Sequence, residues 1–89
     1  MQPNEIRSKL ISLLTAIAPD VEPQAIDPDR DLRDQFDFDS MDALHFAQAV
    51  SREFGIDVAE KDYPRLTSLH GAGELVQAAL AARSPAPGG

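Results

Sequence analysis

The chain has 89 residues, no cysteine and a net charge of −7, because 15 acidic side chains outnumber 8 basic ones. This length fits one small domain, the lack of cysteine excludes disulfides and thiolate zinc sites, and the acidic balance argues against binding nucleic acid. Because no apolar stretch is long enough to span a membrane and no secretory leader opens the chain, we expect a cytoplasmic protein without membrane insertion.

The first predicted element is a helix over residues 4–18. Asn4 can cap its start, and Pro19 ends it. Its apolar side chains recur at helical spacing and form one face, with Ile11 off that face. The face consists of Ile6, Leu10, Leu13, Leu14 and Ile17.

Residues 19–38 are predicted to form a long loop, because three prolines prevent a continuous helix there. Long connections in small domains tend to be functional. Five apolar side chains should pin the loop over a helical core. They are Val21, Ile26, Leu32, Phe36 and Phe38.

The whole charge imbalance lies in residues 20–42, where nine acids stand against Arg30 and Arg33 and give −7. Outside this segment six acids balance six bases. A concentrated negative surface favours partners with a positive face and speeds their encounter. The alternative is that most of these aspartates are simply solvated.

Three aspartates in the loop, Asp27, Asp29 and Asp31, have the spacing of the first ligands of a calcium-binding EF-hand. The sixth position is Leu32 where that motif needs glycine, and the twelfth is Phe38 where it needs a bidentate glutamate. We therefore predict no metal site.

The second helix is predicted over residues 40–54. Asp39 is a good N-cap, and Asp42 can reach back to it as the acid of a capping box. Ser40 then stands at the first helical position, with a hydroxyl that capping does not use. Because a helix N-terminus favours a bound phosphate, this corner suits a phosphodiester.

The two sides of this helix differ. The buried side should contain Ala43, Phe46, Ala47, Val50 and Phe54. The opposite side is interpreted as a docking surface for several partners, although single exposed apolar residues are common on surfaces. The candidate docking residues are Met41, Asp42, Leu44, His45, Gln48 and Arg52.

Gly55 is expected to end this helix in left-handed geometry. Ile56 and Val58 should follow as extended chain. Residues 60–66 have room for only a turn or two of helix, which Pro64 interrupts.

A last helix is predicted after Thr67 or Ser68, either of which can cap it. Gly71 and Gly73 weaken its first turns or permit the close approach of a neighbour. Its apolar face consists of Leu69, Ala72, Val76, Ala79 and Leu80.

The composition of the C-terminal end changes to proline, glycine and alanine. We expect residues 84–89 to form a flexible tail and residues 1–83 to form the domain.

Catalytic residues are not evident. Ser40 and His45 point about 140° apart on a helix and cannot share a proton directly. No nucleophile elbow surrounds the serine, and His70 is expected at the surface. We predict that the chain is not an enzyme.

Asp39-Ser40-Met41 resembles the Asp-Ser-Leu signature of acyl carrier proteins, in which the serine receives 4′-phosphopantetheine from coenzyme A. The predicted order of long helix, long loop, helix, short helix and helix over residues 4–82 is similar to that family. Phe54-Gly55-Ile56 resembles the stretch after the family's second helix, and Leu66-Thr67-Ser68-Leu69 resembles its entry into the last one.

The resemblance implies an all-α, four-helix acyl-carrier-like bundle with a long first loop and a short third helix. It implies a stand-alone, monomeric carrier that holds acyl groups as thioesters on 4′-phosphopantetheine attached to Ser40, beside Asp39 and Met41. The implied partners are a phosphopantetheinyl transferase and enzymes that load and transfer acyl groups. It also implies a hydrophobic cleft between the second helix and the Ile56–Leu66 region, which sequesters the acyl chain.

Departures from the family pattern bear on the pathway. Met41 replaces a leucine, and Asp37 stands where the family often has glycine. Glutamates that are common in carriers of the fatty acid synthases are replaced by His45, Ser51 and Arg52. These departures favour a specialised fatty-acid, lipid or secondary-metabolite pathway.

Two alternatives stay open, and a third is disfavoured. The cargo of a carrier can be aminoacyl or peptidyl in place of fatty acyl. The chain can be a helical interaction module that binds a basic partner through its acidic loop, with Ser40 only structural. A sulfur or protein-conjugation carrier that uses Gly88-Gly89 is disfavoured, because such proteins have a β-grasp fold and this sequence has almost no strand pattern.

Overall fold

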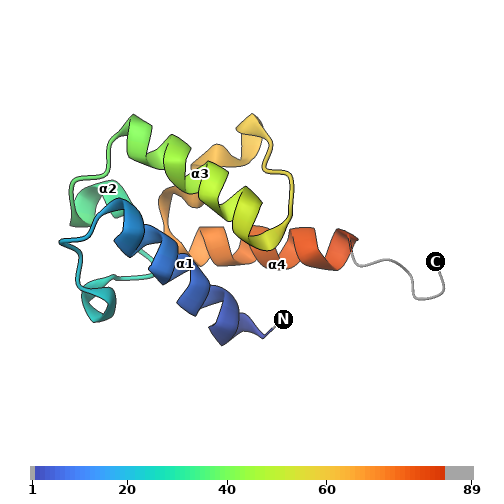
Figure 1. Ribbon diagram of the computed structural model, residues 1–89, viewed down its shortest axis with the longest axis horizontal. Coiled ribbons are helices and arrows are strands. Elements are labelled where there is room, and N and C mark those ends of the chain that lie inside the picture. Colours follow the sequence, from blue (N-terminus) through green and yellow to red (C-terminus); the bar gives the residue numbers. More distant parts are fainter. Residues whose placement is uncertain (1, 84–89) are drawn as a thin grey trace.

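The computed structural model describes residues 2–83, which form helices joined by loops (Figure 1). No described residue is in a strand, so the predicted all-α fold with a long first connection and a short third helix is confirmed. The predicted tail, residues 84–89, lies outside the described residues. The elements, with η for a 3₁₀ helix, are α1 (Pro3–Ile17), η1 (Pro23–Ala25), α2 (Leu32–Gln35), α3 (Ser40–Phe54), η2 (Glu60–Thr67) and α4 (Leu69–Arg83).

Helix α1 starts one residue earlier than predicted. Gln2 is its N-cap, in place of Asn4, and the Glu5 carboxylate accepts a hydrogen bond from the Gln2 N–H at 3.3 Å. Pro3 fits the first helical position, where an amide hydrogen has no partner inside the helix. The Asn4 cap was therefore the wrong choice, because a proline directly before it already begins the helix.

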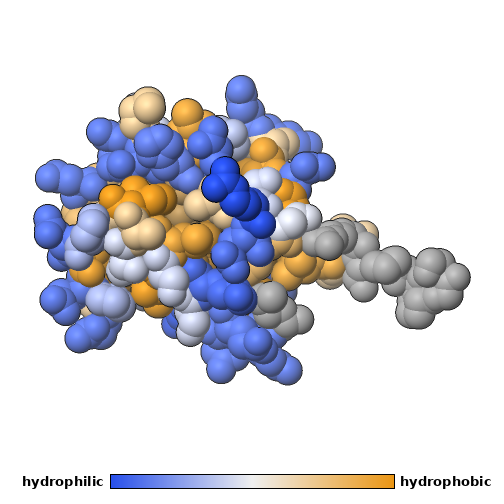
Figure 2. All heavy atoms as spheres, in the orientation of Figure 1, coloured by the Kyte–Doolittle hydropathy of each residue, from blue (hydrophilic) through white to orange (hydrophobic). Residues whose placement is uncertain are grey.

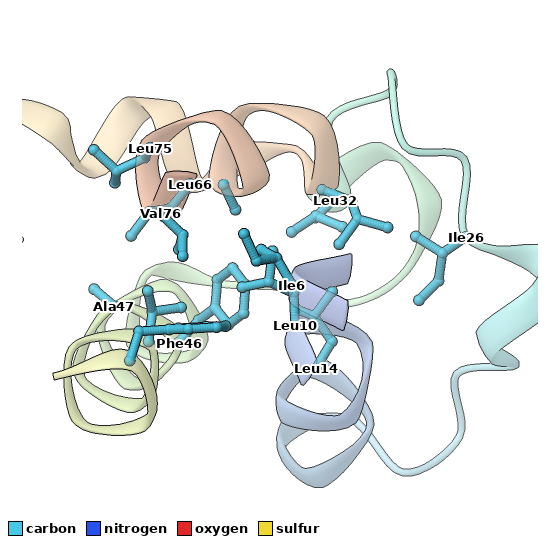
Figure 3. Packing of buried hydrophobic residues seen from close by; sticks show 14 of the residues in the cluster. Ile6, Leu10, Leu14, Ile26, Leu32, Phe46, Ala47, Leu66, Leu75 and Val76 are labelled. Carbon is cyan, nitrogen blue, oxygen red and sulfur yellow. The ribbon is translucent and has the colours of Figure 1, made fainter. Parts of the chain in front are cut away.

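Helices α1 and α3 run side by side in opposite directions, and α4 packs across both (Figure 1). Phe46 of α3 is fully buried in the space between these three helices (Figure 3). Among the described residues, no polar or charged residue is buried. The core consists of Ile6, Leu10, Leu14, Ile26, Leu32, Phe38, Phe46, Ala47, Val50, Phe54, Ile56, Leu66, Leu69, Ala72, Leu75 and Val76.

Most residues of the predicted apolar faces belong to the core or pack against it. Leu13 and Ile17 are only half-buried at its edge, and Ile11, predicted off the face, also packs against it. Leu75 is buried beside Val76, although the sequence pattern did not include it. No helix within residues 2–83 combines the length and apolar character needed to cross a membrane.

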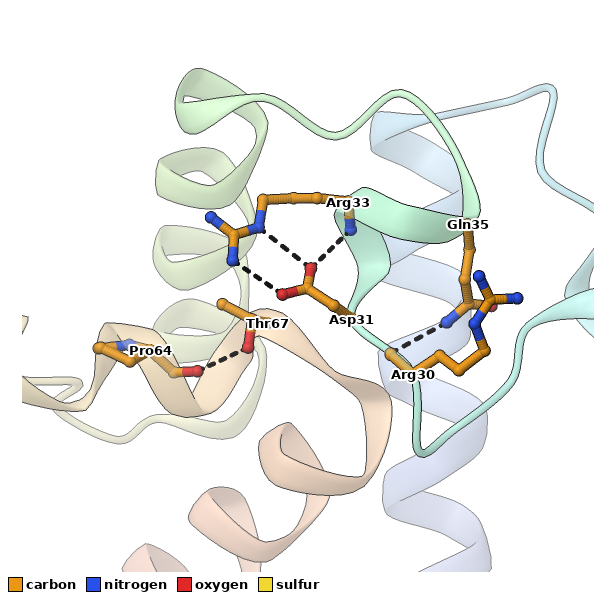
Figure 4. A network of polar contacts seen from close by, with 6 residues as sticks. All are labelled: Arg30, Asp31, Arg33, Gln35, Pro64 and Thr67. Carbon is orange, nitrogen blue, oxygen red and sulfur yellow. Dashed lines mark hydrogen bonds and ion pairs between the residues drawn. The ribbon is translucent and has the colours of Figure 1, made fainter.

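The first connection is more ordered than a loop, because it contains η1 and α2. Asp31 caps α2: its Oδ1 accepts a hydrogen bond from the Arg33 N–H at 2.8 Å, and its Oδ2 lies 2.8 Å from Arg33 Nη2 (Figure 4). The hydrogen bonds from Arg33 lower the pKa of the Asp31 carboxyl, and those to Asp31 raise the pKa of Arg33.

The side chain of Gln35 ties this connection together. Its Oε1 accepts from the Asp27 N–H at 2.7 Å, and its Nε2 donates to the Asp27 carbonyl at 2.8 Å. Nε2 also donates to the Arg30 carbonyl at 3.0 Å (Figure 4). The Pro28 carbonyl accepts from the His70 N–H at 2.8 Å and so joins the connection to α4. Of the predicted apolar anchors, Ile26, Leu32 and Phe38 are buried, and Val21 and Phe36 are half-buried against the core.

The side chains of Asp27 and Asp31, two of the three aspartates with EF-hand spacing, form local hydrogen bonds. Asp27 Oδ1 accepts from the Asp29 N–H at 3.0 Å, and the Asp31 carboxylate is occupied by Arg33. Within residues 2–83, no three acidic or histidine side chains are grouped so that they could hold a metal ion.

In the second half of the chain, the helices end and begin at the predicted positions. Gly55 ends α3 with φ 65° and ψ 37°, in the left-handed region that favours glycine. Pro64 lies inside η2, and its carbonyl accepts from Thr67 Oγ1 at 2.7 Å (Figure 4). Ser68, not Thr67, caps α4, because its Oγ accepts from the Gly71 N–H at 3.0 Å.

Gly71 and Gly73 differ in what surrounds them, which gives a matched pair of substitutions. A Cβ on Gly71 would lie 2.3 Å from the Arg65 carbonyl oxygen, so Gly71→Ala should lower the free energy of unfolding by about 1–3 kcal/mol. Gly73 has no atom within 4 Å of that position, so Gly73→Ala should raise it by about 0.5–1 kcal/mol through helix propensity. Urea unfolding measures both, and equal effects would contradict the close packing of η2 on α4.

Candidate functional site

An aromatic cluster fixes the segment that leads to α3. Phe38 packs edge-on against Phe36 and against Phe46, with ring centroids 5.8 and 6.1 Å apart. Edge-to-face pairs of this kind add about 0.5–1.5 kcal/mol beyond the area that they bury. Because Phe38 is buried and Asp39 and Ser40 are exposed, the chain turns outward at this point and presents Ser40 to solvent.

The start of α3 is held by the predicted capping box. Asp39 Oδ1 accepts from the Asp42 N–H at 2.9 Å, and Asp42 Oδ2 accepts from the Asp39 N–H at 3.3 Å. The Asp39 carbonyl accepts from the Ala43 N–H at 2.9 Å. The amides of Ser40 and Met41 have no acceptor inside the helix, so they are available to an anion outside it.

Ser40 itself is exposed, and within residues 2–83 its hydroxyl makes no hydrogen bond. His45 is also exposed, and no hydrogen bond joins it to Ser40. The serine therefore has no base of its own among the described residues. Its oxygen is suited to accept a group that a separate protein delivers, with the base supplied by that protein.

The predicted docking residues lie on the outer side of α3. Met41 is 56% exposed, His45, Gln48 and Arg52 are exposed, and Leu44 is half-buried without packing on the core. The sixth candidate, Asp42, is half-buried and its carboxylate is engaged in the capping box. We call the surface of Met41, Leu44, His45, Gln48 and Arg52 the outer face of α3.

Several hollows border this helix, and two of them bear on where cargo could lie. The η2 hollow, about 310 Å³, lies between α3 and η2 and is lined by Ala47, Gln48, Ser51, Arg52, Val58 and Tyr63. The cleft was predicted between the second helix and the Ile56–Leu66 region, and Val58 and Tyr63 of that region line this hollow, whereas Ile56 and Leu66 are buried in the core. Its lining is mixed, with polar side chains on the α3 side.

The loop hollow, about 500 Å³, lies between the end of α1, the first connection and the start of α3. Its lining residues are Ile17, Ala18, Pro19, Asp20, Val21, Glu22, Ala25, Ile26, Gln35, Phe36, Asp37 and Asp42. The sequence did not predict this hollow, because it depends on how Gln35 folds the connection back on itself. The only local signal was the run of apolar anchors in an otherwise polar segment.

The chain matches a protein-family model. The family model described as "Phosphopantetheine attachment site" matches residues 8–78, which is more than half of the chain and includes Ser40. No match is found among curated proteins.

The capping box and the free hydroxyl predict different effects for two neighbouring substitutions. Asp39→Ala should lower the free energy of unfolding by about 1 kcal/mol, because the Asp42 amide loses its acceptor. Ser40→Ala should change it by less than about 0.5 kcal/mol, because the Ser40 side chain contributes no hydrogen bond. Thermal unfolding followed by circular dichroism tests the pair, and an equal loss in both variants would show that Ser40 has a structural role.

Proposed function

The chain belongs to the phosphopantetheine-attachment family of carrier domains, and we propose that it is an acyl carrier protein with Ser40 as its attachment residue. The observation that supports this most directly is the Ser40 hydroxyl, which is exposed and makes no hydrogen bond within residues 2–83. Domains of this family carry covalently attached 4′-phosphopantetheine and are not themselves catalytic.

The residues around Ser40 fit such a group. The amides of Ser40 and Met41 face outward at the positive end of α3, where a phosphodiester is favoured. Asp39 and Asp42 take their hydrogen bonds from the helix itself, so they hold the helix start and not the ligand. When bound, 4′-phosphopantetheine supplies a terminal thiol on a flexible arm, which the chain cannot supply because it has no cysteine.

Attachment requires a phosphopantetheinyl transferase. The Ser40 oxygen would attack the pyrophosphate phosphorus of coenzyme A that bears the pantetheine and would lose its proton to a base of the transferase. The bond from that phosphorus to the bridging oxygen would break, and adenosine 3′,5′-bisphosphate would leave. The role of this chain is to hold the serine at the outward turn between Phe38 and α3, where a second protein can reach it. Phe38 and the capping box are therefore positioning elements.

Partner enzymes are proposed to dock on the outer face of α3. Met41 and Leu44 give it an apolar centre within two turns of Ser40, and Arg52 gives its far end a positive charge. Within residues 2–83, Arg52 forms no ion pair, whereas its neighbour Glu53 pairs with Lys9 at 3.2 Å. A complementary partner would have an apolar patch, a positive region opposite Asp37 and Asp39, and a negative region opposite Arg52.

This charge pattern supports a pathway other than general fatty-acid synthesis. A partner built for an acidic helix would meet Arg52 and His45 where it expects negative charge, and like charges across an interface disfavour the wrong partner. We place the protein in the cytoplasm, in a specialised fatty-acid, lipid or secondary-metabolite pathway. An aminoacyl or peptidyl cargo is the alternative within the carrier class, and a non-carrier acidic module is the alternative outside it.

The attachment residue can be tested by intact mass. Incubation with coenzyme A and a broad-specificity phosphopantetheinyl transferase should add one phosphopantetheine, and Ser40→Ala should abolish the addition while it retains helical circular dichroism. Ser8→Ala, at an exposed serine of α1, is the control and should be modified like the parent. Addition to the Ser40→Ala protein, or none to the parent, would contradict the proposal.

The docking face can be tested by the rate at which a cognate enzyme loads the carrier. Arg52→Glu should slow loading by roughly fivefold or more, equivalent to about 1 kcal/mol, because it replaces an attractive charge with a repulsive one opposite the partner's negative region. Met41→Ala should have an effect of similar size without loss of stability, because Met41 is exposed.

Arg7→Glu is the matched control, since Arg7 is exposed on α1 and away from this face. Equal slowing by Arg7→Glu and Arg52→Glu would indicate an effect of net charge and not of docking. Unfolding curves of all variants separate docking from stability.

A further inference from the structure

The loop hollow has a mainly apolar floor. Its apolar lining comes from the end of α1 and from the first connection, namely Ile17, Ala18, Pro19, Val21, Ala25, Ile26 and Phe36. Figure 2 shows apolar surface on the face formed by α1 and this connection, with hydrophilic residues around it. A volume of about 500 Å³ lies within the range of about 300–1,000 Å³ that is typical of small-molecule sites.

The rim of the loop hollow is acidic. Asp20, Glu22, Asp37 and Asp42 line it, and no lysine, arginine or histidine does. The carboxylates of Asp20, Glu22 and Asp37 are exposed and form no ion pair or hydrogen bond with other described residues. The rim therefore carries negative charge that the protein does not neutralise.

The two bases of this segment do not line the hollow. Arg33 is paired with Asp31 and lines a neighbouring hollow that also borders Asp37 and Asp42. Arg30 donates to the Asp34 carbonyl at 3.4 Å. Apolar walls below an acidic rim fit a ligand with an apolar body and a positive charge at one end.

The hollow opens beside the attachment residue. Asp37 and Asp42, which line it, are three residues before and two residues after Ser40. A group tethered at Ser40 would reach the mouth at an effective concentration far above that of any free ligand. A weak, open site that a free molecule would leave empty can therefore be filled by tethered cargo.

We propose that the loop hollow is a cargo site for an acyl group that combines an apolar side chain with a free ammonium group, such as an aminoacyl group with an aliphatic side chain. This inference rests on the proposed attachment at Ser40, and among the carrier cargoes it favours the aminoacyl alternative over a fatty-acyl one. The side chain would occupy the space lined by Val21, Ala25 and Phe36, and the ammonium group would lie near the rim. A cargo with a terminal carboxylate would be repelled there, and a neutral acyl group would gain only the apolar contact.

The test compares two cargoes of the same shape. The carrier is loaded by a broad-specificity transferase from coenzyme A analogues with hydrolysis-resistant, amide-linked leucyl or 4-methylpentanoyl groups, which differ only by the amine. Backbone amide chemical shifts are then compared with those of the protein bearing the unacylated arm. The leucyl arm should shift the amides of Val21, Ala25 and Phe36 more than the 4-methylpentanoyl arm, and should leave Ala47 and Tyr63 of the η2 hollow unchanged.

Two variants test the rim and the floor. Glu22→Gln combined with Asp37→Asn should reduce the leucyl-specific shifts by about threefold, the effect expected of exposed ion pairs, and should leave the 4-methylpentanoyl shifts unchanged. Ala25→Leu should reduce the shifts for both cargoes by filling the hollow.

The controls carry the same substitutions on exposed residues that do not line the hollow. They are Glu60→Gln combined with Asp57→Asn, and Ala78→Leu. Neither control should change the shifts.

The outcomes are distinguishable. Absence of any mass addition would contradict the attachment at Ser40 and not the cargo site in particular. Successful loading with equal shifts for the two cargoes, or with shifts confined to the η2 hollow, would overturn the cargo site. Rim substitutions that slow loading by an enzyme but leave the leucyl shifts unchanged would also overturn it, and would assign the acidic rim to a basic partner.

Discussion

The position of Ser40 depends on the packing of Phe38 between Phe36 and Phe46. A residue that follows a buried aromatic side chain can be turned outward only if the backbone changes direction at once, and the N-cap conformation of Asp39 makes this change. The side chain of Phe38 thus points into the core, and the N-cap conformation of Asp39 directs the next residue, Ser40, outward. The exposure of Ser40 follows from the pair, without any contact made by the serine itself.

The sequence predicted those elements whose ends are determined by neighbouring residues. The bounds of α3 were correct, because Asp39 and Asp42 define its start and Gly55 its end within a few residues. The start of α1 was wrong by one residue, because Asn4 is the better N-cap by residue type, whereas Pro3 fits the first helical position and so makes Gln2 the N-cap. Helix α2 was not predicted, because four residues show too little periodicity to reveal a helix.

Features that depend on distant contacts could not be predicted from the pattern alone. Gln35 bonds the backbone at Asp27, eight residues earlier, and His70 bonds Pro28 across the domain. Both contacts use backbone groups, whose partners no side-chain pattern specifies. These contacts set the path of the first connection, whose residues line the loop hollow together with the end of α1. The two glycines of α4 also illustrate this limit, because only the position of the Arg65 carbonyl shows that Gly71 is needed and Gly73 is not.

The η2 hollow and the loop hollow lie differently relative to the outer face of α3. Gln48 and Arg52 belong to that face and also line the η2 hollow, so an enzyme seated on the face would cover that hollow. Among the α3 residues, only Asp42 lines the loop hollow; at about 100° per residue it lies about 160° from Leu44 and about 60° from His45. An enzyme that contacts both the outer face and Asp37 would therefore reach the rim of the loop hollow. Cargo held there would lie beside the attachment residue and within reach of the enzyme, whereas cargo in the η2 hollow would be covered when the enzyme docks.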